Sequence, residues 1–195
     1  MKFKIIHLES AKENITCDLS ELSYYLIPNC EILQFFDDGS LEAIGFVSQE
    51  TLVGFAIDFA QYALDNHCQK NKVDSRLTEG LIVARRYLKK QASRKEVQAA
   101  AHAAYDVSHS YPRIRSRAYG AAANAATNAI YAIYANNNNI ANAVISASDS
   151  AKNKLKERNR QGNYILSFFK GEHGSVAQLT ASSLTLPARS VILEE

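Results

Sequence analysis

The spacing of hydrophobic residues changes once along the chain, near Ser48. Before this point the chain holds short runs rich in β-forming residues, and two of them flank Asp37-Asp38-Gly39-Ser40. An Asp-Gly step between apolar runs favours a β-hairpin, because both residues tolerate positive φ at low cost. We therefore predict a small α+β module with strands at 3–8, 31–36 and 41–47 and a short helix at 22–27.

From Ser48 onward, hydrophobic residues recur with the period of about 3.6 that is typical of α-helices. Helix signals divide this region: Ser93 and Glu96 have capping-box spacing, Pro112 suits a first turn, and Asn139 can cap the helix that follows it. The predicted helices cover residues 49–66, 75–90, 93–110, 112–135 and 140–160. Gly162 then stands at the position expected just past a helix end.

Alanine is concentrated in these predicted helices, with 19 alanines among residues 92–151. Alanine is the best helix former and has little bulk, so facing alanine ridges bring helix axes toward the short end of the roughly 8–10 Å range. Bulky residues such as Tyr119 and Ile130 punctuate the same stretch and need burial. We predict a mainly α protein with the module at 1–47, an alanine-rich antiparallel helical bundle at 48–162, and a C-terminal segment at 163–195 that packs on the bundle or on the N-terminal sheet.

The composition is that of a soluble globular protein, with 47% hydrophobic and 22% charged residues among 195. No run approaches the roughly 18 apolar residues of a membrane span, and the first residues lack the apolar centre of a signal peptide. We expect a cytoplasmic protein without a membrane partner. Cys17, Cys30 and Cys68 form no C-x-x-C pair, so neither a disulfide scaffold nor a zinc ribbon is predicted.

The net charge of +2 conceals an asymmetry along the chain. Residues 1–70 carry four basic and eleven acidic residues, whereas residues 71–120 carry eleven basic and four acidic residues. Such a chain either binds charged partners at its two ends or docks its acidic front against its own basic middle.

One group of residues has the spacing of metal ligands on a helix, because His102, Asp106 and His109 fall on one helical face. No second cluster completes a coordination sphere, so we predict neither a metal nor another cofactor. The adjacent His67 and Cys68 would point about 100° apart on a helix, so they do not pair as base and nucleophile. The common nucleotide-binding and hydrolytic signatures are absent, and we predict that the protein is not an enzyme.

Basic residues gather in two places. Arg113, Arg115 and Arg117 open the predicted helix at 112–135, where cations oppose the helix dipole and need another partner. That partner is either a nucleic acid or carboxylates of the same chain. The alternating lysines and arginines from 152 to 160 spread around a helix, so they are interpreted as a solvated helix end.

Residues 51–135 combine an apolar helix that has a late cysteine, Asp74-Ser-Arg76 at the head of a helix, Ala99-Ala-Ala-His-Ala-Ala104, and the small-residue segment Arg117-Ala-Tyr-Gly-Ala-Ala-Ala123. In these features the chain resembles a diverged member of the all-helical immunity proteins of bacterial polymorphic-toxin systems. The likeness covers somewhat under half of the chain. Asp74 and Arg76 are expected to be structural, as a helix cap and a buried ion pair.

The resemblance implies a non-catalytic protein inhibitor, an immunity or anti-defence protein of bacterial or phage origin that neutralises a toxin or effector protein. Acidic residues suit this role, because they mimic phosphate in a basic cleft. The candidate contacts are Asp37, Asp38, Glu42, Glu50, Asp58 and Asp65, with Tyr24, Tyr25, Phe35 and Phe36 as anchors or, alternatively, as core of the module. The alternative function is a nucleic-acid-associated regulator that uses Arg113, Arg115 and Arg117.

Overall fold

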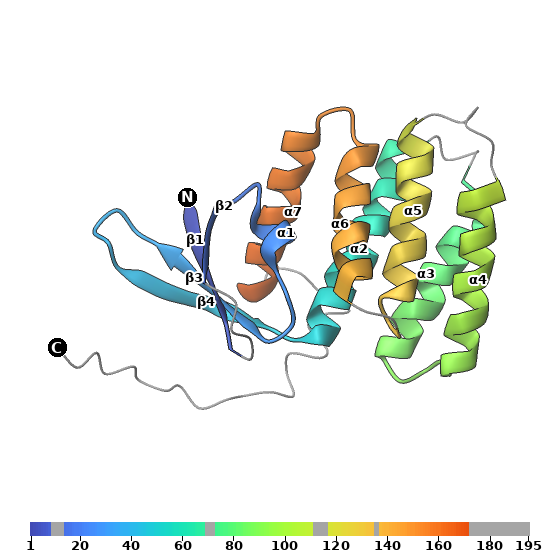
Figure 1. The fold of residues 1–195 in the computed structure, drawn as a ribbon, viewed down its shortest axis with the longest axis horizontal. Coiled ribbons are helices and arrows are strands. Elements are labelled where there is room, and N and C mark those ends of the chain that lie inside the picture. Colours follow the sequence, from blue (N-terminus) through green and yellow to red (C-terminus); the bar gives the residue numbers. More distant parts are fainter. Residues whose placement is uncertain (9–13, 69–72, 111–116, 135–136, 172–195) are drawn as a thin grey trace.

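The computed structural model describes residues 1–8, 14–68, 73–110, 117–134 and 137–171 (Figure 1). A small antiparallel sheet comes first, and helices make up most of the described chain. The strands are β1 (Lys2–His7), β2 (Ile15–Asp18), β3 (Cys30–Phe35) and β4 (Leu41–Val47). The helices are α1 (Leu22–Tyr25), α2 (Gln49–His67), α3 (Ser75–Leu88), α4 (Arg94–Ser110), α5 (Arg117–Tyr131), α6 (Asn137–Ser150) and α7 (Lys154–Phe169). The predicted α+β module followed by helices is confirmed, while most of the predicted C-terminal segment lies outside the described residues.

The sheet has the strand order β2-β1-β3-β4, and each strand is antiparallel to its neighbours. Phe3 and Ile5 alternate with lysines along β1 and are fully buried, so one face of the sheet points into the core. Ile5 pairs with Ile32 of β3. The predicted hairpin between β3 and β4 is confirmed, and Gly39 takes φ +83° in its turn, where a side chain would strain the backbone.

The edge strand β2 was not predicted. It pairs with β1, which places Ile15 opposite Ile5 and Cys17 opposite Phe3. The strand is only four residues long, and the short helix α1 follows it almost directly. The N-terminal module is therefore a four-stranded sheet with one helical turn beside it.

Helix α2 matches the prediction for 49–66 and is the helix against which α3, α5 and α6 all pack. Ser48 caps it, because the Ser48 Oγ accepts a hydrogen bond from the Thr51 N–H at 3.2 Å. Phe55 lies edge-on to Phe168 with 5.1 Å between ring centres. This aromatic contact brings α7 against α2.

The capping signals predicted for α3 and α4 are present. Asp74 accepts a hydrogen bond from the Arg76 N–H at 3.1 Å, and Ser93 and Glu96 exchange the two bonds of a capping box at 2.7 and 3.3 Å. The ion pair between Asp74 and Arg76 differs from the expectation. The Arg76 side chain is 46% exposed, so this 2.8 Å pair lies at the surface and is not buried.

Small residues let α5 approach its neighbours closely. The fully buried alanines of α5 are Ala122, Ala123, Ala125, Ala126 and Ala129. Thr127 Oγ1 donates a hydrogen bond to the Ala104 backbone oxygen of α4 at 3.1 Å. A Cβ added to Gly80 of α3 would lie 2.5 Å from the Ile130 Cδ1, so α3 also packs tightly on α5.

The predicted helix at 140–160 is wrong in its extent, because the chain leaves α6 after Ser150 and starts α7 at Lys154. Asn153 between them caps the second helix, since its side chain accepts a hydrogen bond from the Lys156 N–H at 3.0 Å. The periodic pattern of this stretch therefore belongs to two helices joined by a tight turn.

Gly162 does not end a helix but lies buried inside α7. A Cβ at Gly162 would collide with the backbone oxygen of Leu19, so glycine is required by close packing on the N-terminal module. The ring of Phe169, at the end of α7, occupies the space that a Cβ on Gly45 of β4 would take. The predicted boundary at residue 162 thus falls within a helix that contacts the module at both of these points.

Candidate functional site

The predicted acidic contact residues divide into two groups, and the first lies at the end of the β3–β4 hairpin. Asp37, Asp38 and Glu42 are all exposed on this arm, which extends away from the helices (Figure 1). Phe36 and Leu41 lie beside them and are 41% and 44% exposed. The hairpin end therefore presents carboxylates and hydrophobic side chains together.

The carboxylate of Asp38 is held in place by Ser40. The hydroxyl and the backbone N–H of Ser40 donate hydrogen bonds to Asp38 Oδ1 at 2.6 and 2.9 Å. These bonds favour the ionised form and hold the pKa of Asp38 below its usual value. The turn thus presents an oriented negative charge.

The second acidic group lies on α2 and is not a single surface. Asp58 has partners within the chain: its Oδ1 lies 3.3 Å from the Arg85 Nη2, and its Oδ2 accepts a hydrogen bond from the Tyr164 hydroxyl at 2.6 Å. The ion pair between Asp58 and Arg85 joins the acidic segment 1–70 to the basic segment 71–120. Asp65 and Glu50 are exposed, and Glu50 lies in the first turn of α2, where an acidic residue complements the helix dipole.

The aromatic candidates also separate. The Tyr24 hydroxyl accepts a hydrogen bond from the Arg158 Nε at 2.6 Å, so Tyr24 contacts α7 within the chain. Phe35 is partly buried on β3. Tyr25 is 38% exposed and, with Phe36, is available to a partner.

A pocket of about 740 Å³ lies where the ends of α2, α5, α6 and α7 meet. Lys152, Lys156 and Arg160 line it at intervals of four residues. A spacing of four residues returns to the same side of a helix, so these three basic residues face one pocket. The other two basic residues of the run lie elsewhere, because Lys154 pairs with Asp149 and Arg158 contacts Tyr24. The lining of the pocket therefore contains these basic side chains together with a network of polar contacts among His67, Ser150 and Glu157.

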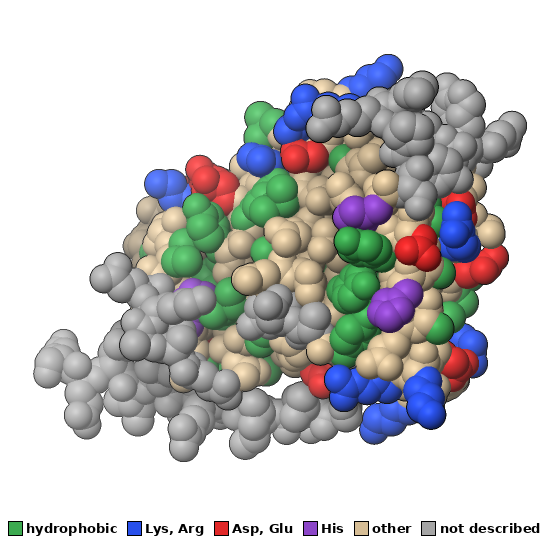
Figure 2. Space-filling view, turned by 45° about the vertical axis from the view of Figure 1, so that its right-hand side comes forward, with side chains coloured by type: hydrophobic (Ala, Val, Ile, Leu, Met, Phe, Trp, Pro, Cys, Tyr) green, Lys and Arg blue, Asp and Glu red, His purple; other side chains and the backbone are tan. Residues whose placement is uncertain are grey.

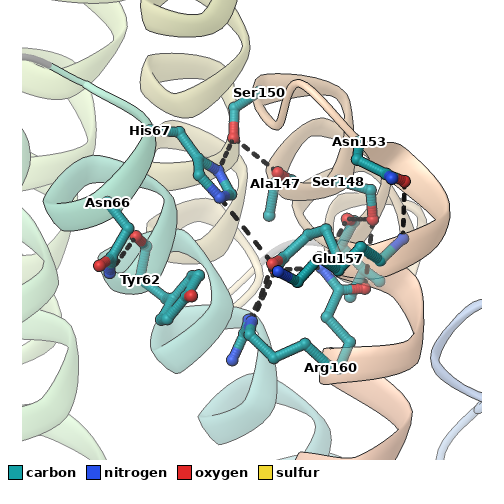
Figure 3. A network of polar contacts seen from close by, with 12 residues as sticks. Tyr62, Asn66, His67, Ala147, Ser148, Ser150, Asn153, Glu157 and Arg160 are labelled. Carbon is teal, nitrogen blue, oxygen red and sulfur yellow. Dashed lines mark hydrogen bonds and ion pairs between the residues drawn. The ribbon is translucent and has the colours of Figure 1, made fainter.

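The polar network is built on the buried carboxylate of Glu157, which is 4% exposed (Figure 3). Arg160 donates hydrogen bonds to it from Nε at 2.8 Å and from Nη2 at 2.6 Å. The guanidinium carbon of Arg160 lies 3.5 Å from the ring centre of Tyr62. His67 approaches from the end of α2, with its Nε2 3.9 Å from the Glu157 Oε2. The buried charge is therefore paired and its partner is held by stacking.

His67 and Ser150 lie close together but are not arranged as a base and its nucleophile. The Ser150 hydroxyl donates to the Ala147 backbone oxygen at 2.6 Å, so it accepts a hydrogen bond from the His67 Nδ1 at 2.7 Å. Activation of a serine requires the reverse direction. Burial lowers the pKa of His67, with Arg160 acting in the same sense and Glu157 against it. Neutral His67 is thus a structural donor in this geometry.

The cysteines are equally unreactive. Burial raises the pKa of Cys17, Cys30 and Cys68 to about 11 in each case, and acidic neighbours contribute at Cys17. With these pKa values the thiols remain protonated at neutral pH. Because the thiolate is the nucleophilic form, the three cysteines are poor nucleophiles.

The residues with metal-ligand spacing, His102, Asp106 and His109, are exposed on α4. On the face drawn in Figure 2, histidine side chains (purple) are separated from one another by hydrophobic side chains (green). The His109 ring stacks on Tyr105 with 3.8 Å between ring centres, and the His109 Nδ1 lies 3.0 Å from the Tyr105 backbone oxygen. Across the described ranges, His102, Asp106 and His109 included, no three histidine, cysteine or acidic residues form a group that could hold a metal ion.

The arginines of the alternative function are described only in part. Arg113 and Arg115 lie outside the described residues. Arg117 is exposed as the first residue of α5, and the next residue, Ala118, lines the pocket. The start of α5 therefore lies beside the basic wall of that pocket.

No family model, curated protein or solved structure matches this chain. The resemblance to immunity proteins accordingly stays a prediction from the residues quoted for it. Within the part of the chain that the structure describes, no helix combines the length and the hydrophobicity needed to cross a bilayer.

Proposed function

We propose that this protein is a non-catalytic inhibitor, an immunity or anti-defence protein, that binds and neutralises a bacterial toxin or effector protein. The observation that carries the proposal is the end of the β3–β4 hairpin, where the exposed acids Asp37, Asp38 and Glu42 are sequence neighbours of the exposed side chains of Phe36 and Leu41. Exposed hydrophobic groups rimmed by polar ones are typical of protein-binding sites.

The two kinds of side chain at the hairpin end contribute differently. The carboxylates attract a basic surface and speed association with it. Phe36 provides the aromatic area that binding hot spots commonly bury. Together they fit a partner with a basic cleft that contains an apolar pocket.

The remainder of the molecule acts as a rigid support in this proposal. The alanine-rich antiparallel helical bundle packs closely, and α7 reaches β4 through the contact of Phe169 with Gly45. A preorganised support loses little conformational freedom when the hairpin docks, which favours tight binding.

Co-expression in a bacterial host with the protein encoded next to it tests this function, with growth as the readout. We expect the wild-type chain to relieve growth arrest and to form a 1:1 complex without turnover. The variant Asp37→Lys/Asp38→Lys should lose protection, because it reverses the charge of the contact. Glu79→Lys/Asp106→Lys is the matched control, since it reverses the same number of exposed acidic charges but lies on α3 and α4.

Failure of the wild-type chain to protect would overturn the inhibitor function. Protection by the hairpin variant that equals wild-type protection would overturn the hairpin as the contact. Circular dichroism of both variants verifies that they are folded before growth is compared.

A nucleic-acid-associated regulatory protein is the second candidate, and one observation favours it. Arg117 begins α5 beside the pocket that Lys152 and Lys156 line. A gel shift on random duplex DNA at two salt concentrations tests this function. A nucleic-acid-associated function predicts that the affinity for DNA falls steeply as the salt concentration rises. It also predicts that binding is lost when Arg113, Arg115 and Arg117 are replaced together by glutamine. Lack of a shift at low salt would reject it.

A further inference from the structure

The inhibitor proposal makes no use of the pocket between the ends of α2, α5, α6 and α7. Its volume of about 740 Å³ lies within the range of roughly 300–1,000 Å³ that is usual for small-molecule sites. Figure 3 shows the region, with His67 of α2 and Glu157 of α7 facing each other. The lining contains amide, imidazole and ammonium groups, so it offers hydrogen bonds and positive charge to a polar ligand.

Lys152 and Lys156 bring two positive charges to this pocket. Both are exposed, and neither forms an ion pair with a described residue. The neighbouring cations differ, because Lys154 pairs with Asp149 and Arg160 pairs with Glu157. The pocket therefore has two positive charges that no described carboxylate neutralises.

The first turn of α7 lies next to this pocket, because Asn153 and Lys156 line it. Asn153 uses its side chain to accept the Lys156 N–H at 3.0 Å and its backbone oxygen to accept the Glu157 N–H at 3.1 Å. The N–H groups of Lys154 and Leu155 precede these and have no acceptor among the described residues. The positive end of the helix dipole strengthens their attraction for an anion.

Glu157, Arg160 and Tyr62 form one wall of the pocket and hold one another in place. The Glu157 carboxylate, which would repel an anion if it were alone, is 4% exposed and receives the Arg160 guanidinium. The stacking of Arg160 on Tyr62 holds that guanidinium in one orientation. A preformed wall lowers the entropic cost of ligand binding.

We propose that this pocket binds the phosphate group of a small organic phosphate. Lys152 and Lys156 contact the phosphate oxygens, and the nearby positive end of the α7 dipole favours the bound anion. Two uncompensated positive charges match a phosphate dianion, whereas a single carboxylate would leave one charge unmatched. The volume beyond the phosphate accommodates the organic part. This inference goes beyond the inhibitor function and does not depend on it.

His67 reports on an anion in the pocket. Its ring lines the pocket and lies beside Glu157, and burial lowers its pKa. A bound dianion favours the imidazolium form, so it raises the pKa of His67. Arg160 lies near the His67 ring and lowers the pKa of His67. Its own charge stays constant over the pH range in which histidine titrates.

NMR titration of isotopically labelled protein with inorganic phosphate and with adenosine monophosphate tests the proposal. We expect saturable shifts of the amides of the lining residues Lys152, Asn153 and Lys156 and a raised pKa of His67. The variant Lys152→Gln/Lys156→Gln should bind about 100-fold more weakly, because each charge-assisted contact contributes roughly tenfold. Both lysines are exposed, so the variant should fold normally.

Lys89→Gln/Lys95→Gln is the matched control. It removes the same charge from two exposed lysines near the α3–α4 connection, which lies at the opposite end of the helices from the α6–α7 connection (Figure 1). We expect this variant to bind both probes like the wild type. Shifts that do not saturate, or equal losses in the two variants, would overturn the proposal, because phosphate would then respond only to overall charge.

A short single-stranded DNA with and without a 5′-phosphate distinguishes a phosphate monoester from a nucleic-acid backbone. Binding that requires the terminal phosphate supports the proposed site. Equal binding of both strands, with the steep salt dependence of several phosphate contacts, would assign the lysines to nucleic acid and overturn the small-ligand proposal.

Discussion

Arg158 donates a hydrogen bond from its Nε to the phenolic oxygen of Tyr24 at 2.6 Å, and its guanidinium carbon lies 4.6 Å from the centre of the same ring. The two residues are 134 positions apart and join α7 to α1. Ser23 next to Tyr24 also donates a hydrogen bond to the Gln161 side chain at 3.1 Å. The N-terminal module and the last described helix therefore share one polar interface.

We expect Tyr24 and Arg158 to be energetically coupled. Tyr24→Phe removes the hydroxyl but keeps the ring, so it should lower the free energy of unfolding by about 1 kcal/mol. In a double-mutant cycle with Arg158→Ala, the coupling should be about 0.5–1 kcal/mol. Urea denaturation followed by circular dichroism measures it, and strictly additive effects would show that the contact contributes nothing.

Loss of the Glu157 carboxylate should be costly. Glu157→Ala leaves the partly buried guanidinium of Arg160 without its partner, and we expect a loss of about 2–3 kcal/mol in the free energy of unfolding. Asp149→Ala is the control, because its ion pair with Lys154 is exposed and should contribute less than about 1 kcal/mol. Chemical denaturation compares the two, and equal losses would contradict the prediction.

Two glycine-to-alanine changes should have opposite signs. Gly162→Ala places a methyl group against the backbone oxygen of Leu19 and should destabilise the protein by about 1–3 kcal/mol. Gly120→Ala meets no atom within 4 Å and should stabilise α5 by about 0.5–1 kcal/mol. Thermal unfolding should give a lower Tm for the first variant and a higher Tm for the second. A change of the same sign in both would refute the packing argument.

Stability should fall as the pH is lowered from 7 to 5. The pKa of His67 lies below its ordinary value of 6.5, mainly because burial disfavours the imidazolium. The unfolded chain therefore takes up this proton at a higher pH than the folded protein, and protonation favours unfolding. Neutral His67 contributes its full stabilisation at pH values above the ordinary histidine pKa of 6.5. That stabilisation is lost as the pH falls from 6.5 through the lower pKa of His67 in the folded protein.

His67→Gln tests this dependence, because glutamine keeps a donor for Ser150 but does not titrate. Urea denaturation at pH 5, 6 and 7 should give a flatter profile for the variant than for the wild type. A variant profile as steep as that of the wild type would assign the pH dependence to other groups.

Elements with strong local signals could be predicted from the sequence. The Asp-Gly step placed the β3–β4 hairpin, and the Ser93–Glu96 spacing placed the start of α4, because both depend on backbone hydrogen bonds within a few residues. The exposed acids Asp37 and Asp38 followed directly from the hairpin turn.

Elements that depend on tertiary contacts could not be predicted in the same way. Strand β2 is four residues long and acquires its structure by pairing with β1. The sequence pattern predicts a helix end at Gly162, whereas glycine is required there because the Leu19 backbone packs directly against it. Asn153 was the signal for the break before α7, but it lies within a stretch whose periodicity favours one long helix.

The candidate site shows the same limit. The pocket combines His67, Ala118 and the segment around Lys152 and Lys156, which only the folded chain brings together. The four-residue spacing of Lys152, Lys156 and Arg160 is present in the sequence, but the residues that complete the pocket with them are distant along the chain. The role of Asp58 likewise depended on Arg85 and Tyr164, which are distant in sequence.

The insertion of the Phe169 ring against Gly45 also bears on protein synthesis. The strands leave the ribosome first, but the ring that covers this part of β4 is translated more than a hundred residues later. During that interval the nascent sheet exposes an uncovered apolar surface, the kind of surface that chaperones bind. The packing of α7 onto β4 is therefore a late step that depends on contacts between residues far apart in the sequence.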